Sequence, residues 1–180
     1  MWVGCRRSRG SGTKVIDLSG SIVAPGFIDA HTHIENTFLR PCEVSKAVIS
    51  RDTTAVFADP HEIANVASFE GLSYMAEELS ETPLKAFLLV PPNVPASLKA
   101  PDVGGALLGY EEVIENMDLF SGVGEIMDIG SLLDGDERFI EYASRLSTAV
   151  IVQGHAAGLR GEDLDAYASL SIGNDHEVTE

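Results

Sequence analysis

The chain has 180 residues, 44% of them hydrophobic, which is enough to bury the core of one domain and short for two. Its formal net charge of −16 makes nucleic-acid backbones and anionic membranes unfavourable partners, because both would repel it. Two cysteines, Cys5 and Cys42, are too few for a disulfide framework, and no apolar run approaches the roughly 18 residues of a membrane span, so we expect a soluble, cytoplasmic protein.

Strand and helix patterns alternate along most of the chain. Residues 1–13, rich in Arg, Ser and Gly, are expected to form a disordered lead. A short strand is then expected over 15–18, and a second over 22–34 with a bend at Pro25-Gly26. The later expected helices are 43–50, 66–80, 110–119, 137–146 and 161–170, and the later expected strands are 53–58, 86–90, 122–129, 149–152 and 172–176.

This alternation defines the fold class. Successive strands are separated by helices and no hairpin signal joins them, which predicts βαβ units, a parallel sheet and an α/β protein. An open doubly wound sheet and a barrel both fit. No Gly-x-Gly-x-x-Gly follows the first strand and no Gly-x-x-x-x-Gly-Lys is present, so nothing favours a nucleotide-binding open sheet.

Polar side chains that can bind metals cluster at the ends of the expected strands. His31 and His33 are two residues apart, so on a strand their imidazoles project from the same face. The carboxyl ends of barrel strands converge on one mouth, so a shared metal site is expected there, and a glutamate such as Glu125 has two oxygens that can each bind one of two cations. The later strand ends carry Asp59, His61 and Glu62, then Asn93, then Glu125 and Asp128, then His155, and finally Asp175, His176 and Glu177.

Five segments resemble a known enzyme family in the order in which that family shows them. Residues 25–35 resemble the opening signature of the amidohydrolase superfamily, and residues 59–66 look like the adenine deaminases within it. The other three are Gly124-Glu125-Ile126-Met127, Gly154-His155-Ala156 and Asp175-His176-Glu177. The resemblance covers roughly residues 15–180. It implies a TIM-type (β/α)8 barrel flanked by a small β-sandwich, with 14–24 a remnant of the sandwich and 25–180 an incomplete barrel of about six βα units.

The resemblance also implies an activity. It predicts a hydrolase that converts adenine and water to hypoxanthine and ammonia, with a binuclear centre of Mn, Fe or Zn as its cofactor and a purine as its small-molecule partner. Water would add to C6 of the purine, and a nearby acid would protonate N1 and the departing amine. The implied metal ligands are His31 and His33 for one ion, His155 and His176 for the other, and Glu125 between them. The implied catalytic set is Glu125, His61, Glu62 and Glu177, and the implied substrate contacts are Glu35, Asn93 and Asp59.

Several alternatives stay open at this point. His61 and Glu62 fit a proton-transfer role, support of a metal ligand, a further cation site with Asp59, or stabilisation of a loop. Another cyclic amide or amidine is an alternative substrate, because Pro92-Asn93 stands where the family tends to have Ser-Cys. Only six barrel strands can be counted, whereas a barrel needs eight, so we expect this chain to be a fragment of a longer enzyme. The full-length enzyme is a candidate homo-oligomer. A non-catalytic piece is the remaining alternative.

Overall fold

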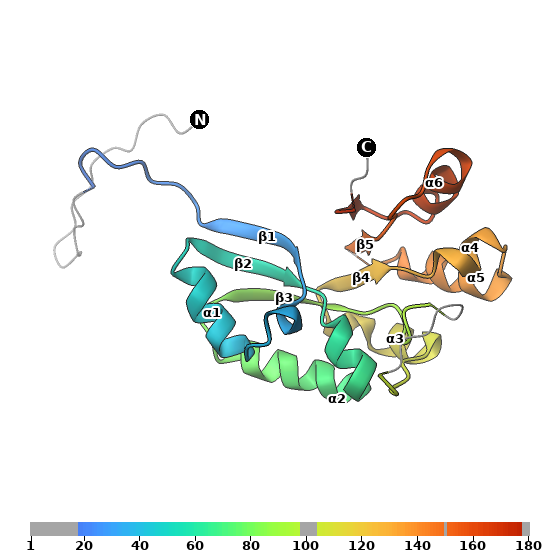
Figure 1. Cartoon of the computed structure of the whole chain (residues 1–180), viewed down its shortest axis with the longest axis horizontal. Coiled ribbons are helices and arrows are strands. Elements are labelled where there is room, and N and C mark those ends of the chain that lie inside the picture. Colours follow the sequence, from blue (N-terminus) through green and yellow to red (C-terminus); the bar gives the residue numbers. More distant parts are fainter. Residues whose placement is uncertain (1–17, 98–103, 150, 178–180) are drawn as a thin grey trace.

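The computed structural model describes residues 18–97, 104–149 and 151–177 (Figure 1). Six strands form one sheet, and every neighbouring pair is parallel. The strands are β1 (Phe27–Thr32), β2 (Thr53–Ala58), β3 (Lys85–Val90), β4 (Gly122–Ile126), β5 (Val152–Gly154) and β6 (Asn174–Asp175). The α-helices are α1 (Pro41–Ile49), α2 (His61–Ser80), α3 (Tyr110–Asn116), α4 (Ile129–Leu133), α5 (Glu137–Leu146) and α6 (Gly161–Ala168), with short 3-10 helices η1 (Ile34–Thr37) and η2 (Met117–Leu119).

The order of the strands distinguishes the two folds that the sequence left open. The sheet runs β1-β2-β3-β4-β5-β6, so each strand lies beside the next one in the chain. A doubly wound sheet reverses its strand order at a switch point, whereas a barrel does not. The predicted incomplete TIM-type barrel is therefore confirmed. Its six parallel strands alternate with helices and form a curled sheet, which is part of a barrel wall.

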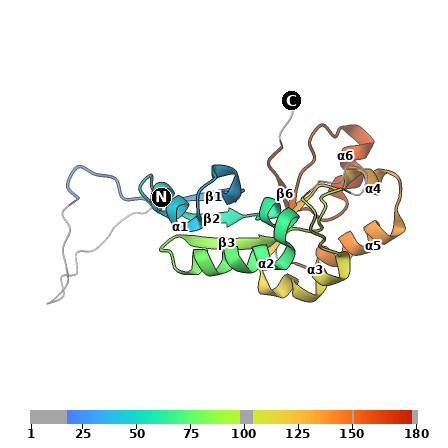
Figure 2. The ribbon, with the colours of Figure 1, turned by 60° about the horizontal axis from the view of Figure 1, so that its bottom comes forward.

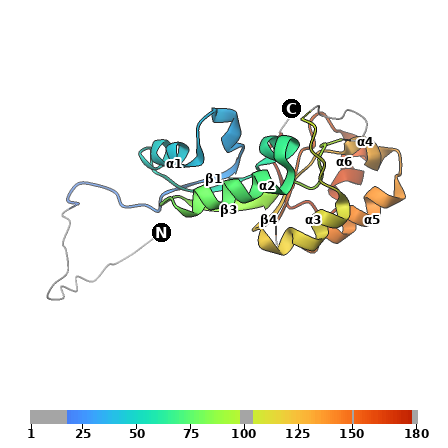
Figure 3. The same ribbon diagram turned by 90° about the horizontal axis from the view of Figure 1, so that it is seen from below.

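The helices cover one face of this wall. In Figure 1, α1 and α2 lie beneath β1, β2 and β3, and the views in Figures 2 and 3 show α3 and α5 side by side further along the sheet. Rings of α3 and α5 meet there, since Tyr110 stacks on Tyr142 with 4.0 Å between centroids. Because all strands are parallel, their carboxyl ends point to the same edge of the sheet, where polar side chains of distant segments can meet.

Two apolar clusters fill the space between sheet and helices. The first joins α1 and α2 to β2 and β3 and contains Val44, Val56, Met75, Leu79 and Leu84. The second joins β3, β4 and β5 to the later helices and includes Val90, Val123, Phe139, Leu146 and Tyr167. Burial of this kind stabilises the wall by roughly 25 cal/mol for each Å² of apolar surface removed from water. It also provides a rigid base for the strand ends.

β1 is an edge of the sheet and is largely uncovered. Phe27 and Ile28 are 68% and 64% exposed, whereas all five residues of β4 are buried. Residues 18–26 precede β1 without a helix or strand. Residues 1–17 lie outside the described part of the chain. The disordered lead expected at 1–13 and most of the strand expected at 15–18 therefore fall outside it too. The division into 1–13, 14–24 and 25–180 stays a prediction.

Most expected elements are confirmed, with corrections at their ends. The strand expected over 22–34 is shorter, and that at 149–152 lies later, at Val152–Gly154. The strand expected over 172–176 is reduced to Asn174–Asp175. The helix expected to start at residue 66 already starts at His61 and is kinked at Ser68, whose φ of 49° interrupts the helical backbone.

The strand expected over 122–129 is also too long. It ends at Ile126, and Asp128 instead caps α4, where its carboxylate accepts the backbone N–H of Ser131. An aspartate at this position satisfies a donor that the first helical turn leaves free. Among the described residues, none of the helices has both the length and the hydropathy that a bilayer crossing requires.

Candidate metal centre

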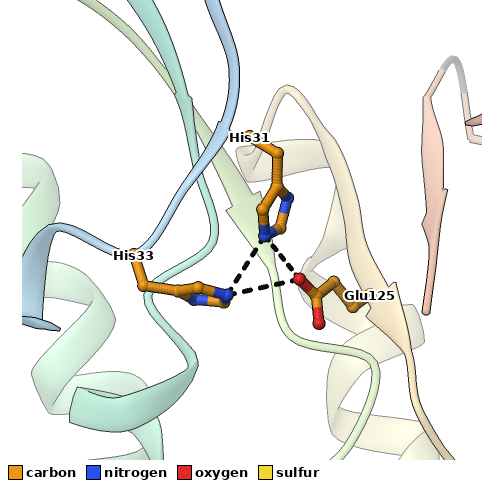
Figure 4. Close-up of side chains that lie close together, drawn as sticks. All are labelled: His31, His33 and Glu125. Carbon is orange, nitrogen blue, oxygen red and sulfur yellow. Dashed lines mark hydrogen bonds and ion pairs between the residues drawn. The ribbon is translucent and has the colours of Figure 1, made fainter. Parts of the chain in front are cut away.

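The centre begins with two histidines at the end of β1. His31 is in the strand and His33 follows it, so the period of two directs both rings toward the same side. Their Nε2 atoms lie 3.1 Å apart (Figure 4). The expected juxtaposition of the two imidazoles is thus present.

Glu125 of β4 meets these histidines from across the sheet. Its side chain is buried, and its Oε1 contacts Nε2 of His31 and lies 3.2 Å from Nε2 of His33 (Figure 4). A buried carboxylate is costly unless charged or polar groups surround it. Here the imidazole nitrogens are those groups.

The hydrogen bonds made by Nδ1 of His31 and of His33 show which nitrogen of each ring has a lone pair available for a metal. Nδ1 of His31 donates to Oε1 of Gln153 at 2.6 Å, and Nδ1 of His33 donates to the backbone oxygen of Asp59 at 2.8 Å. A neutral imidazole carries only one N–H, so Nε2 of each neutral ring is a lone-pair acceptor. Both lone pairs are directed at the same small space as Oε1 of Glu125.

Three acceptor atoms this close together require a positive species between them. A proton can serve one pair, but a metal ion satisfies all three. Nitrogen ligands at about 2.0–2.1 Å in a tetrahedral arrangement stand ~3.3 Å apart, close to the spacing observed. The residues therefore fit a divalent cation.

A second group of ligands uses the same glutamate. Nδ1 of His155, just after β5, lies 2.9 Å from Oε2 of Glu125, and Nε2 of His176, just after β6, lies 3.1 Å from Oε1. The rings of His31 and His176 stack with 4.0 Å between centroids. In each group of three, Glu125 with His31 and His33 or Glu125 with His155 and His176, the ligand atoms lie within 4.8 Å of one another. Glu125 belongs to both groups, as a ligand shared by two cations would.

Hydrogen bonds behind the ligands hold the backbone in place. The fully buried carboxylate of Asp59 accepts the backbone N–H of Glu125 at 2.8 Å. The Tyr167 hydroxyl accepts the N–H of His155 at 2.7 Å and donates to the oxygen of Ile126 at 2.5 Å. Such partners fix the direction of metal ligands.

The charges of the cluster shift its protonation equilibria. Burial opposes the charge on Glu125, but the hydrogen bonds from His155, His31 and His33 outweigh it and hold the pKa of Glu125 below its usual range. Burial likewise opposes the charge on His33, yet Glu125 and Glu62 raise its pKa to about 11. A cation bound to these nitrogens would have to displace such protons.

Two further predicted residues lie beside the cluster. Oε2 of Glu62 is 3.3 Å from Nδ1 of His33, while Oε1 of Glu177 is 3.5 Å from Nε2 of His176 and 3.9 Å from Nδ1 of His155. Both carboxylates are 39% exposed, so they face solvent as well as the histidines. Both thus contact histidines of the cluster while remaining accessible from solvent.

The remaining predicted residues have other surroundings. His61 is buried in the first turn of α2, and Glu35 accepts the N–H of Ile63 in that turn at 3.2 Å. The carboxylate of Asp59 faces the backbone of Glu125 instead of open space. Asn93 donates to the oxygen of Pro95, lines a cavity of about 310 Å³, and has a buried Oδ1 with no hydrogen bond to any described residue.

Two residues of the site were missed from the sequence, Gln153 and Tyr167. Gln153 is polar within a short apolar strand pattern and directly precedes Gly154-His155, which was an available signal. Tyr167 lies in α6, where an aromatic residue is ordinary core material, and its hydroxyl gives no signal at the sequence level.

Comparison with known proteins agrees with this geometry. Residues 22–180 match the sequence profile described as the amidohydrolase family. The chain is 40% identical over 170 residues to an adenine deaminase of Methanoculleus marisnigri, covering 93% of this chain and 32% of that protein. It is 42% identical over 174 residues to an adenine deaminase of Clostridium acetobutylicum, covering 93% and 30%, and 40% identical over 171 residues to one of Archaeoglobus fulgidus, covering 94% and 30%. The chain thus spans 30–32% of the length of these relatives.

Proposed function

Since this chain belongs to the amidohydrolase family, we propose that it carries most of the metal centre of an enzyme that hydrolyses adenine to hypoxanthine and ammonia. The observation that carries the metal part is the convergence of the His31 and His33 lone pairs on Glu125. The choice of adenine rests on the names of the relatives and on the likeness of residues 59–66 to adenine deaminases.

The proposed ligand set has two halves with one shared member. His31 and His33 would hold one divalent cation, His155 and His176 a second, and Glu125 would contact both. Imidazole and carboxylate ligands suit manganese, iron and zinc. When bound, the cations supply Lewis acidity that polarises the substrate and lowers the pKa of a water molecule.

Glu62 and Glu177 are our candidates for moving protons. The hydrogen bonds from His33 and Asn36 outweigh the effect of burial and hold the pKa of Glu62 below its usual value, so its carboxylate is ionised at neutral pH. An ionised carboxylate beside the centre can take a proton from the attacking water and return it to the departing group. The reaction balances when the water oxygen bonds to C6, the C6–N6 bond breaks, one proton of the water leaves with the amine as ammonia, and the other ends on N1 of hypoxanthine.

Of the three residues expected to contact the substrate, Asn93, Asp59 and Glu35, the observed hydrogen bonds favour only Asn93 for that role. Asn93 stays a candidate for binding the purine, because its buried Oδ1 has no hydrogen bond to a described residue and Asn93 lines a cavity. For Asp59 and Glu35 the observed contacts favour support of Glu125 and of the first turn of α2. His61, buried in that same turn, is kept as a candidate proton carrier.

The net charge of −16 and the two cysteines support a cytoplasmic location for such an enzyme of purine breakdown.

The test is ammonia release by the purified full-length protein. After removal of bound metal, manganese, iron or zinc is added back and ammonia is measured with adenine and with a panel of other purines, pyrimidines and hydantoins. We expect release from adenine that depends on the added metal and is abolished by Glu125→Ala. No release from adenine with any of the three metals contradicts the proposal, and release from a different ring would transfer it to that substrate.

A further inference from the structure

Gln153 connects two strands that are not neighbours in the sheet. It is the only glutamine of the chain, is 2% exposed, and lies in β5, whereas its partners lie in β1. Its Oε1 accepts the Nδ1–H of His31 at 2.6 Å and its Nε2 donates to the oxygen of Ala30 at 2.8 Å. Both ends of the amide are therefore used, and both on the strand that carries the first metal-ligand pair.

The direction of these two hydrogen bonds, from donor to acceptor, is set by the backbone oxygen of Ala30. The backbone oxygen of Ala30 can only accept a hydrogen bond, so the amide nitrogen of Gln153 must face it. The amide oxygen then faces His31 and can only accept, so Nδ1 of His31 must carry the hydrogen. In the neutral ring the lone pair of His31 is thereby left on Nε2, the atom that faces His33 and Glu125.

We propose that Gln153 is a positioning residue of the metal centre, which fixes the ring direction of His31 and makes Nε2 the ligand atom. This inference rests on the proposed metal centre. Partners behind a ligating histidine set its tautomer and its orientation, and their loss typically weakens metal binding 10–100-fold.

An amide suits this place better than a carboxylate. The centre already contains Glu125, with Glu62 and Glu177 beside it, and a further negative charge would repel them. A carboxylate would also place an acceptor against the Ala30 oxygen. The neutral glutamine satisfies His31 and Ala30 together and adds no charge.

The experiment compares zinc binding and the imidazole ¹⁵N spectrum in three forms of the purified protein. Gln153→Met keeps the length of the side chain and removes both polar ends, while Gln153→Glu keeps an acceptor for His31. We expect Gln153→Met to lose about 10–100-fold in zinc affinity at one site, and Gln153→Glu, which keeps the acceptor for His31 but not the donor to Ala30, to recover only part of that loss. In the zinc-loaded wild type we expect a His31 Nδ1–H signal and coordination through Nε2. In Gln153→Met we expect the His31 ring to show more than one tautomer or orientation, so that this signal is weakened or lost.

Tyr142→Phe is the matched control, because it removes a buried hydrogen bond to a backbone oxygen, that of Pro92, away from the ligands. Its zinc affinity should equal that of the wild type. If Gln153→Met does not fold, Gln153→Asn replaces it, since the shorter amide cannot reach both partners.

The outcomes separate the two proposals. A wild type that binds no zinc contradicts the metal centre and this inference with it. A wild type that binds zinc, beside a Gln153→Met protein that binds equally well with the His31 Nδ1–H signal intact, overturns only the role of Gln153.

Discussion

The backbone N–H of Glu125 donates a 2.8 Å hydrogen bond to the carboxylate of Asp59, whose side chain is completely buried. Asp59 follows β2 and Glu125 lies in β4, so this bond passes the end of the intervening strand β3. The same Asp59 also accepts the Nδ1–H of His33 through its backbone oxygen. One residue thus supports two of the proposed ligands, Glu125 through its side chain and His33 through its backbone.

Gly124 gives the Asp59 carboxylate its space. A Cβ at position 124 would lie 2.2 Å from Oδ2 of Asp59 and 2.5 Å from its Cγ. We expect Gly124→Ala to lower the free energy of unfolding by about 1–3 kcal/mol, since neither the strand nor the buried carboxylate can move aside freely. Urea denaturation of the metal-free protein measures this.

The control for that change is Gly173→Ala, where, among the described residues, the added Cβ would come within 4 Å of the Val152 oxygen alone, at 3.7 Å. Its unfolding midpoint should stay close to that of the wild type. Equal midpoints for both variants would contradict the close packing described for Gly124.

Asp59 makes stability depend on pH in a predictable direction. Burial raises the pKa of Asp59 to about 7 from the ordinary 3.8. Between these values the folded protein holds a proton that the unfolded chain has lost, so this residue's contribution to stability falls as the pH rises from about 4 to 7 and is constant above. Asp59→Asn removes this residue's pH dependence of the free energy of unfolding. The stability of the variant relative to the wild type should therefore change by on the order of 2–4 kcal/mol between pH 4 and 7.

The measurement is the free energy of unfolding of metal-free wild type and Asp59→Asn at several pH values between 4 and 8. The variant should gain stability relative to the wild type with increasing pH. A difference that is flat across this range would show that the carboxyl of Asp59 titrates normally.

Metal uptake should release protons. The pKa of His155 is raised mainly by its hydrogen bond to Glu125, and the pKa of His33 reaches about 11 although burial opposes it. Metal ions bind only neutral imidazoles, so these protons must leave at neutral pH, and affinity must fall as the pH falls. Calorimetry of zinc binding in buffers of different ionisation enthalpy counts the protons, and heats that do not vary with the buffer would contradict this prediction.

Glu125 and Glu177 should respond differently to the same change. Glu125→Gln replaces the shared ligand with an amide and should reduce the bound metal to one ion or fewer for each chain. Glu177→Gln removes a proposed proton carrier that lies beside the cluster, so it should keep the metal content and lower kcat by about 10²–10⁴-fold. Elemental analysis and ammonia release together distinguish the two, and an unchanged metal content in Glu125→Gln would argue against a shared ligand.

Tyr167→Phe tests the support of His155. The change leaves a buried N–H of His155 and a buried oxygen of Ile126 without their partner, which costs about 1–3 kcal/mol of stability. It should also weaken zinc binding. Tyr142→Phe should lower stability as well but leave zinc binding unchanged, and identical zinc affinities in both variants would remove Tyr167 from the support of the site.

The order of the strands and helices, and the polar residues at or just after the strands, could be predicted because they depend on local pattern. β2 matches its expected bounds, α5 begins and ends at the expected residues, and His31, His33, Glu125, His155 and His176 do meet. A barrel with parallel strands brings such residues together whatever the details of packing.

The errors arose where packing across the molecule decides the outcome. The apolar letters after Ile126 extend the strand pattern, and only the capping bond of Asp128 separates β4 from α4. Likewise, no local pattern tells that Gln153 reaches across to β1, because its partners are more than 120 residues away in the sequence. Contacts of this kind depend on the completed curvature of the sheet.

The two groups of ligands begin at His31 and end at His176, and Glu125 belongs to both. A nascent polypeptide leaving the ribosome therefore displays its first imidazoles long before the last one has been translated. If the two groups hold cations as proposed, the site is complete only when synthesis has passed β6, and binding of two ions would require every strand described here to be in place.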